Sequence, residues 1–250
     1  AQGIVAGINA ALKIQGREPM ILDRATSYIG TLVDDLVTKG CSEPYRMMTS
    51  RSEYRLILRQ DNAADRMVPI GHKVGLVSEE RYSKFLDEKR ICEEELLRIK
   101  SVVVHPNEEV NEMLVRKGTS PITTGVRMIE LLKRPQLGYE DLAEFDPGRP
   151  KLKYSLVNKL EVEIKYSGYI RVQQEQIDKM RKLESKSLPE NIDYKTIKGL
   201  RLEAQEKLNK FKPLNVGQAG RISGVNPADV SVLLVWLASK EHGSRGDNNE

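Results

Sequence analysis

The fold class of this chain is decided by the stretch SEERYSKFLDEKRICEEELLRIK, which runs from Ser78 to Lys100. Its apolar side chains recur at the three- and four-residue spacing of a helix, at Tyr82, Phe85, Leu86, Cys92, Leu96, Leu97 and Ile99. Charged residues fill the other positions, as is typical of an amphipathic helix that buries one face. The stretch therefore predicts a helix from Ser78 to about Lys100.

Similar patterns extend in both directions from this stretch. Besides the apolar run that opens the chain, they predict helices at about 27–37, 51–60, 108–117, 126–133, 139–144, 151–165, 168–184, 194–199, 203–211, 216–222 and 228–239. Prolines and glycines separate many of these helices and indicate sharp corners. No segment alternates clearly enough to indicate an extended sheet. The expected fold is mainly α, a multi-helix domain with small helical subdomains.

Local sequence signals predict the ends and the inner faces of some of these helices. The helix at 27–37 is expected to turn Ile29, Leu32, Val33 and Leu36 inward and to end at Gly40. Asn226-Pro227 is a helix cap followed by the proline that favours a first helical position. For the last helix, the apolar stripe Val230, Leu233, Leu234 and Leu237 indicates either core or a partner-facing groove.

One predicted helix carries a basic stripe. Ser50 and Glu53 have the spacing of a capping box that opens the helix at 51–60. In such a helix Arg51, Arg55 and Arg59 lie one turn apart along a single face, just after Arg46. Basic side chains beside Tyr45 suit RNA phosphates and base stacking. Alternatively, Arg59 could pair with Asp61 and Arg55 with a buried carboxylate.

Composition limits the class of protein. The chain has 250 residues, of which 39% are hydrophobic, so it can bury a core. It contains neither a run of eighteen apolar residues nor an export signal, which favours the cytoplasm. Cys41 and Cys92, with three histidines, lack metal-ligand spacing, and both cysteines are expected to be packing residues.

The formal net charge of +4 is unevenly distributed. Between Lys195 and Arg221, only Glu203 and Glu206 oppose seven basic residues, namely Lys195, Lys198, Arg201, Lys207, Lys210, Lys212 and Arg221. Such a basic excess can attract polyanions.

Motifs of catalysis are missing from the sequence. It contains no G-x-G-x-x-G, P-loop or nucleophile elbow, so no residue is proposed as catalytic and no metal site is expected. Asp34 and Asp35 are adjacent in a predicted helix and diverge by roughly 100°, which favours a structural role over acid–base chemistry.

Several long sequence motifs are specific enough to indicate a protein family. In the amino-terminal part they are Gln2-Gly3-x-x-Ala6-Gly7-x-Asn9-Ala10-Ala11, Tyr28-Ile29-Gly30-x-Leu32-Val33-Asp34-Asp35-Leu36-Val37-Thr38-x-Gly40 and Glu43-Pro44-Tyr45-Arg46-Met47-x-Thr49-Ser50-Arg51-x-Glu53-Tyr54-Arg55-Leu56. Later ones are Gly168-Tyr169-Ile170, Glu203-Ala204-x-x-Lys207-Leu208 and Gly217-Gln218-Ala219-x-Arg221-Ile222-Ser223-Gly224-Val225-x-Pro227-Ala228. With them the chain resembles the carboxy-terminal part of the MnmG/GidA family, the large flavoprotein subunit of the tRNA uridine 5-carboxymethylaminomethyl modification enzyme.

This resemblance implies a domain organisation. It implies that 1–22 is the tail of an FAD-binding α/β domain, 23–165 a helical middle domain and 166–239 a carboxy-terminal helical subdomain. The tail 240–250 is polar and is expected to be disordered. The family's phosphate-binding glycines and catalytic cysteines are expected to lie outside this chain, so the chain alone is predicted to be inactive and to bind no cofactor.

The resemblance also implies a function. The family modifies C5 of the tRNA wobble uridine with FAD and NADH, beside an obligate GTPase called MnmE or TrmE, and the full-length protein is expected to be a homodimer. Gln2 and Gly3 match a helix start that points at the flavin, with simple helix packing as an equal alternative. The candidate tRNA-binding residues are Arg46, Arg51, Arg55, Arg59, Lys207 and Arg221.

An alternative interpretation is that the chain is a nucleic-acid-binding regulator with no catalytic activity. The predicted helices at 216–222 and 228–239 resemble a helix-turn-helix. Its second helix, however, begins with Ala228-Asp229-Val230 and continues with aliphatic residues, which offers few base-reading side chains. The flavoenzyme interpretation is therefore favoured.

Overall fold

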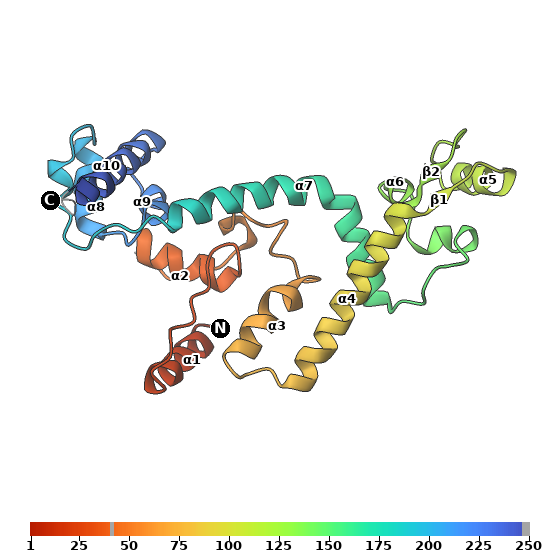
Figure 1. Ribbon diagram of the computed structural model, residues 1–250, viewed down its shortest axis with the longest axis horizontal. Helices are drawn as coiled ribbons and strands as arrows, with labels where there is room; N and C mark the ends of the chain where they lie inside the picture. The colour runs from red at the N-terminus through yellow and green to blue at the C-terminus, as the bar shows by residue number, and fades with distance from the viewer. Residues whose placement is uncertain (41–42, 247–250) are drawn as a thin grey trace. The chain divides into compact units, whose positions relative to one another are not determined.

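The computed structural model describes the backbone at residues 1–40 and 43–246, and side chains up to residue 240 (Figure 1). Its elements, in chain order, are α1 (Gln2–Ile14), α2 (Tyr28–Thr38), η1 (Thr49–Arg51), α3 (Ala63–Lys73), α4 (Glu79–Ser101), β1 (Val103–Val104), α5 (Glu108–Arg116), β2 (Val126–Arg127), α6 (Met128–Leu132), η2 (Glu140–Phe145), α7 (Tyr154–Glu184), η3 (Tyr194–Thr196), α8 (Leu202–Phe211), α9 (Val216–Arg221) and α10 (Pro227–Gly246). The prediction of a mainly helical fold is confirmed. No helix in the described ranges has the length and apolarity needed to cross a membrane.

The chain forms two compact units. Unit 1 combines 1–20 with 56–173, and unit 2 combines 21–55 with 174–250. Each unit therefore draws on two separate stretches of sequence, and the long helix α7 supplies residues to both.

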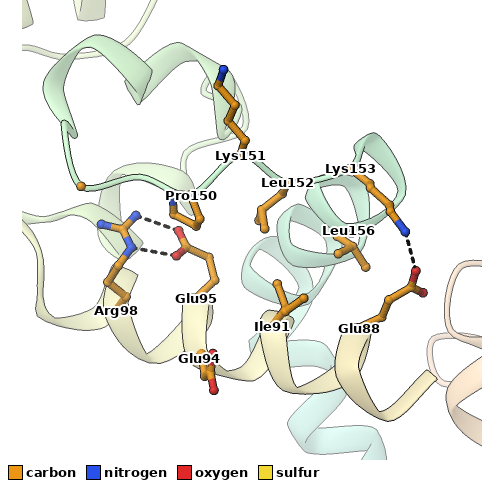
Figure 2. Close-up of a pocket in the computed structure, with 11 residues that line it drawn as sticks. Glu88, Ile91, Glu94, Glu95, Arg98, Pro150, Lys151, Leu152, Lys153 and Leu156 are labelled. Carbon is orange, nitrogen blue, oxygen red and sulfur yellow. Dashed lines mark hydrogen bonds and ion pairs between the residues drawn. The ribbon is translucent and has the colours of Figure 1, made fainter. Parts of the chain in front are cut away.

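Unit 1 is organised along α4, the helix that decided the fold class. Ser78 caps it by accepting a hydrogen bond from the Arg81 amide at 3.4 Å. Near its carboxyl end Glu95 is buried and pairs with Arg98 (Figure 2). Glu95 also accepts a hydrogen bond from the Tyr139 hydroxyl at 2.6 Å. The helix begins with a local side-chain cap and ends beside a tertiary network of charged and aromatic residues.

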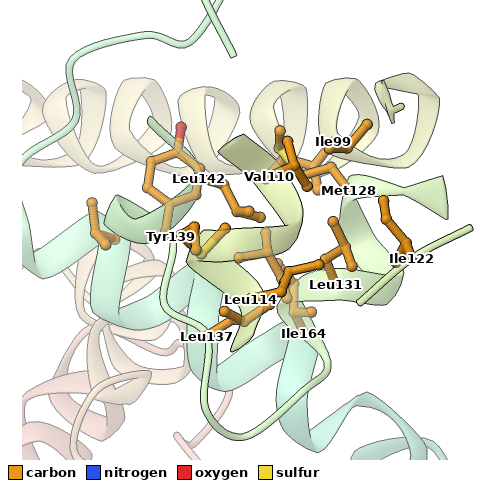
Figure 3. Packing of buried hydrophobic residues seen from close by; sticks show 14 residues of the cluster. Ile99, Val110, Leu114, Ile122, Met128, Leu131, Leu137, Tyr139, Leu142 and Ile164 are labelled. Atoms are coloured by element: carbon orange, nitrogen blue, oxygen red, sulfur yellow. The ribbon is translucent and has the colours of Figure 1, made fainter. Parts of the chain in front are cut away.

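The core of unit 1 lies where α4, α5, α6 and α7 meet (Figure 3). Leu114 of α5, Leu131 of α6 and Leu137 of the following loop are fully buried in it. A two-stranded antiparallel sheet, which pairs Val103 with Arg127, closes one side. Strand β2 occupies the first residues of the helix predicted at 126–133, so that helix is shorter than predicted.

The core of unit 2 is built by η3, α8, α9 and α10. Leu208, Val216 and Leu233 are completely buried there. The Asn226 cap of α10 is confirmed, because the Asp229 amide donates to Asn226 Oδ1 and the Asn226 amide donates to Asp229 Oδ2, both at 2.9 Å. The predicted stripe of α10, comprising Val230, Leu233, Leu234 and Leu237, packs on this core.

Two helix predictions were wrong. No helix forms at 51–60, because Ser52 adopts an extended backbone with ψ 129° and Glu53 binds Arg24 instead of a helix cap. The break predicted around Gly168 is also absent, since α7 is continuous. Gly168 sits on its exposed surface, where the helix needs no special glycine geometry.

The inward face predicted for α2 was wrong as well. Its buried residues are Gly30, Thr31, Asp35 and Thr38, whereas Val33 is 42% exposed. A Cβ on Gly30 would lie 2.1 Å from the Asp23 carbonyl oxygen, so the helix is pressed against the loop before it. The polar face turns inward because it carries ion-pair partners of a buried arginine.

The remaining predictions concern the cysteines and the tail. Cys92 is buried beside Leu156 and Leu160, as expected for a packing residue, and Cys41 lies outside the described residues. At 240–246, where disorder was predicted, the backbone continues α10, and 247–250 lie outside the described residues.

Candidate nucleic-acid interface

A buried arginine organises the amino-terminal half of unit 2. Arg24 is 5% exposed and donates to Asp35 at 2.7 Å and to Asp34 at 3.1 Å. Its other nitrogens, Nε and Nη2, each donate to Glu53 at 2.8 Å. The bidentate geometry with Glu53 is the strong form of this interaction. Arg24 therefore ties α2 to the segment around Glu53, and sequence periodicity gives no signal for it.

A second arginine extends the network to α7 and α9. Arg221 donates to both Asp34 oxygens at 2.7 Å and to Glu184 at 2.8 Å. Asp34 thus lies between Arg24 and Arg221. We call Arg24, Asp34, Asp35, Glu53, Glu184 and Arg221 the arginine hub. The structural role favoured for the two adjacent aspartates is confirmed.

The hub controls the protonation of its members. Burial alone raises the pKa of Asp35, but hydrogen bonds from Lys39, Tyr45 and Arg24 outweigh it and lower the pKa to about 2. Burial, together with the hydrogen bond to Asp35, raises the pKa of Tyr45 to about 12. Burial opposes the charge on Arg24, yet its bonds to Glu53 and Asp35 raise its pKa. Asp35 and Arg24 are therefore charged at neutral pH, and Tyr45 is neutral.

We expect the lowered pKa of Asp35 to make the free energy of unfolding depend on pH in acid. Because the pKa of Asp35 is lowered from 3.8 to about 2, ionised Asp35 stabilises the fold above pH 4, and this contribution is lost as the pH falls toward 2. The loss should be roughly 2 kcal/mol. Urea unfolding at several pH values should show a shallower acid loss for Asp35→Asn than for the unmodified chain. Asp178→Asn, at an exposed position of α7, is the control, and equal profiles for both variants would contradict the assignment.

The segment after α2, at 43–55, carries exposed cationic side chains next to the arginine hub. Tyr45 is held by a hydrogen bond from its hydroxyl to Asp35 at 2.7 Å, and the Arg51 guanidinium lies 5.3 Å from its ring centroid. A pocket of about 270 Å³ opens here, lined by Asp35, Lys39, Gly40, Glu43, Pro44, Tyr45 and Arg51. An oriented aromatic ring beside a guanidinium is suited to stacking and to phosphate binding.

Two more of the predicted arginines are free to bind a ligand. Arg46 and Arg55 are exposed, and neither forms an ion pair or a side-chain hydrogen bond within the described part of the chain. The predicted helical stripe does not exist, but Arg46, Arg51 and Arg55 still project from one short segment of unit 2. The alternative that Arg55 pairs with a buried carboxylate is not observed.

Two other predicted contact residues are already neutralised. Arg59 belongs to unit 1 and binds Asp61 at 3.0 Å, which is the alternative pairing considered for it. Arg221 is committed to Asp34 and Glu184 in the hub. Neither guanidinium is available to an RNA phosphate without breaking a partly buried ion pair.

The basic run of unit 2 is mostly unpaired. Arg201 binds Asp229 at 2.7 Å, and Arg221 belongs to the hub. No ion pair within the described residues involves the five lysines, Lys195, Lys198, Lys207, Lys210 and Lys212. The predicted basic surface is therefore carried by lysines, including the candidate Lys207.

The candidate cofactor-binding residues are the first two residues of helix α1. Gln2 and Gly3 are exposed, and no side chain caps the helix start at Ala1. A Cβ on Gly3 or Gly7 would meet nothing within 4 Å. A helix of this length leaves backbone N–H groups unpaired at its start, and these groups favour phosphate.

Unit 1 contains a larger pocket that the sequence did not indicate. It has a volume of about 490 Å³ and lies between α4 and the segment at 148–156 (Figure 2). Its wall includes Arg98, whose guanidinium pairs with Glu95 and Asp146. The Arg98 guanidinium is therefore neutralised by two buried carboxylates. In the described part of the chain, no cluster of histidine, cysteine or carboxylate side chains could hold a metal.

The sequence matches the models of two known domain families. Residues 79–174 match the model of the tRNA modifying enzyme MnmG/GidA C-terminal helical domain. Residues 176–250 match that of the tRNA modifying enzyme MnmG/GidA C-terminal helical bundle.

Individual relatives agree over almost the whole chain. The chain is 56% identical, over 98% of its length, to the tRNA uridine 5-carboxymethylaminomethyl modification enzyme MnmG of Caldicellulosiruptor saccharolyticus, and 55% identical, over 96%, to that of Clostridium kluyveri. It spans only 39% and 38% of those proteins. The crystal structure of Aquifex aeolicus GidA, in form II, superposes with a TM-score of 0.79 at 42% identity and covers 94% of this chain and 37% of that one.

Proposed function

The chain belongs to the MnmG/GidA family of tRNA-modifying enzymes, and from this premise we propose that it is the tRNA- and partner-binding portion of a longer flavoenzyme. That enzyme would use FAD and NADH to modify C5 of the tRNA wobble uridine together with the GTPase MnmE. We further propose that the full-length enzyme is a homodimer in the cytoplasm.

One observation carries the RNA-binding part of this proposal. Arg46, Arg51 and Arg55 present unpaired guanidinium groups from a short segment that Arg24 and Tyr45 hold in place. RNA affinity depends on such cations, because each neutralised phosphate releases counterions. The free lysines of the basic run, Lys207 among them, would extend the contact with tRNA.

Binding of the GTPase is proposed for unit 2. Its separate core, formed by η3, α8, α9 and α10, is built mainly from packed apolar side chains. A compact element of this kind suits recognition. The basic lysines and the apolar exposed side chains of α10 offer surfaces for an RNA and a protein at once.

The flavin chemistry is assigned to the remainder of the longer protein. The chain has no dinucleotide-binding motif, so we propose that it is inactive alone. Gln2 and Gly3 are proposed to support FAD binding, because backbone N–H groups at the start of a helix favour phosphate. FAD, when bound, supplies the redox chemistry.

A helix-turn-helix regulator is not favoured. Helix α9 has six residues, and Asp229, near the start of α10, is 1% exposed because it binds Arg201. The second helix of the pair therefore presents few polar side chains that could read bases in a DNA groove.

The RNA proposal is tested with alanine variants of Arg46 and Arg55 in the full-length protein. Each should weaken tRNA binding and lower the salt dependence of binding by roughly 0.7–0.9 log units per log unit of salt. Bound FAD, measured by absorbance, should stay unchanged. Arg116→Ala, which removes an exposed arginine from α5 of unit 1, is the matched control. Wild-type tRNA affinity in both variants would overturn the proposal.

A further inference from the structure

Helix α10 has a second apolar face besides the one that packs into the core. Leu233 is fully buried in the core of unit 2, whereas Val235, two residues later, is 71% exposed. Val232 and Trp236 lie on the same side as Val235, one turn or less away along the helix, and are half-buried at the edge of the core. A helix that only needed to complete the core of unit 2 would carry a polar residue at the exposed position of Val235.

This second face borders a groove. The groove has a volume of about 540 Å³ and is lined by Thr196, Ile197, Lys198, Ser231, Val232, Val235 and Trp236. One residue of its lining is well packed, because Ile197 is 2% exposed and belongs to the core of unit 2. We call this feature the α10 groove. Exposed apolar surface of this kind, with a polar rim, is typical of protein interaction sites.

The charges around the α10 groove are positive. Lys198 is part of its lining, and the Lys240 ammonium lies 5.9 Å from the Trp236 ring centroid. Lys195 lies on the short helix η3 that contributes the groove's Thr196. No carboxylate is among the described residues that line the groove. A ligand that placed acidic groups at this rim would be attracted to it.

We propose that the α10 groove binds an amphipathic helix of a partner protein, with aliphatic side chains in the groove and carboxylates facing Lys198 and Lys240. The inference rests on the proposed role of unit 2 in partner docking and specifies where and how docking occurs. Aliphatic walls favour a helix with apolar anchors at three- and four-residue spacing. They do not favour RNA, since the one aromatic ring already stacks under a lysine and partly packs on the core.

Trp236 provides a direct readout because it is the only tryptophan in the chain. We would titrate the chain with a tryptophan-free helical peptide that carries leucines at the i, i+3, i+4 and i+7 positions and glutamates elsewhere. Binding should shift the Trp236 emission. A matched peptide with lysines in place of the glutamates should bind at least tenfold more weakly. Equal binding of the two peptides, or no binding of either, would overturn the proposal.

Variants locate the binding site. Val235→Glu should weaken binding of the acidic peptide at least tenfold, because it places a like charge and a polar group in the groove, and Lys198→Glu should weaken it about threefold or more. Leu202→Glu is the control, since Leu202 is 78% exposed in unit 2 but does not line the groove. An unchanged melting temperature should accompany each exposed substitution. If Val235→Glu binds as well as Leu202→Glu, or if single-stranded RNA displaces the peptide from wild type, the assignment is overturned.

Capture of the GTPase by the full-length protein separates this proposal from the function on which it rests. Loss of capture by Val235→Glu, with capture by Leu202→Glu retained, supports both. Capture retained by Val235→Glu would leave the docking role standing and overturn the groove. If the unsubstituted full-length protein captured no GTPase, the docking role itself would be overturned, whereas the peptide titration would still report on the groove.

Discussion

Replacing Arg24 by methionine is expected to lower the free energy of unfolding of unit 2 by about 3–5 kcal/mol. The guanidinium is 5% exposed and is paired with Asp34, Asp35 and Glu53. Methionine preserves much of the volume but leaves Asp35, itself 3% exposed, without its closest buried partner. Asp35 would keep its bonds from Lys39 and Tyr45, so the cost comes from breaking the pairs that Arg24 forms with Asp34, Asp35 and Glu53.

Chemical denaturation monitored through Trp236 emission measures this effect, because that residue lies in unit 2. Arg46→Met is the matched control: it removes an exposed arginine from the same unit and should change stability by less than about 0.5 kcal/mol. A loss below about 1 kcal/mol for Arg24→Met would mean that the arginine hub does not hold α2 and the 43–55 segment in place.

The hub also changes how truncation experiments should be read. Deleting residues after Gly199 would remove Leu208, Val216 and Leu233 from the core of unit 2 and Arg221 from the hub. Such a deletion would unfold the unit, so a loss of activity could not be attributed to lost recognition. Single exposed substitutions are the appropriate test of recognition.

Local signals predicted much of this fold. The caps at Ser78 and Asn226 act on amides within three residues, so the helices that they open could be placed from sequence. The capping pattern at Ser50 and Glu53 misled, because the Glu53 carboxylate binds the distant Arg24. Competition between a local cap and a buried tertiary ion pair cannot be decided from spacing alone.

The candidate site shows the same division between local and tertiary information. The exposed, unpaired state of Arg46 and Arg55 agrees with a surface role, whereas Arg221 looked equally basic in sequence and is neutralised by residues from α2 and α7. The polar inner face of α2 could not be found by searching for an apolar stripe. Its tertiary partners Arg24 and Tyr45, together with Lys39, explain why Asp35 is buried.

The second large effect concerns RNA. The triple substitution of Arg46, Arg51 and Arg55 by alanine is expected to weaken tRNA binding roughly 100-fold, if each lost charge-assisted contact with a phosphate contributes about 1 kcal/mol. The fold should survive, because none of the three side chains is buried or forms an ion pair in the described chain. Loss of the cation over Tyr45 should also weaken stacking of a base there.

A lysine version of the triple variant serves as the control. Lysines keep the three charges but lose the planar, bidentate geometry of guanidinium. Affinity should therefore fall less than in the alanine version. If the lysine and alanine versions lost the same affinity, charge would not be the basis of the contact.

The most direct measurement of the central claim is the salt dependence of tRNA binding by the full-length protein. The account predicts that the slope of log affinity against log salt becomes shallower by roughly 2–3 units in the triple alanine variant and stays near wild type in the lysine version. A triple alanine variant with the wild-type slope, at a wild-type content of folded protein, would contradict the claim that these arginines contact the tRNA backbone.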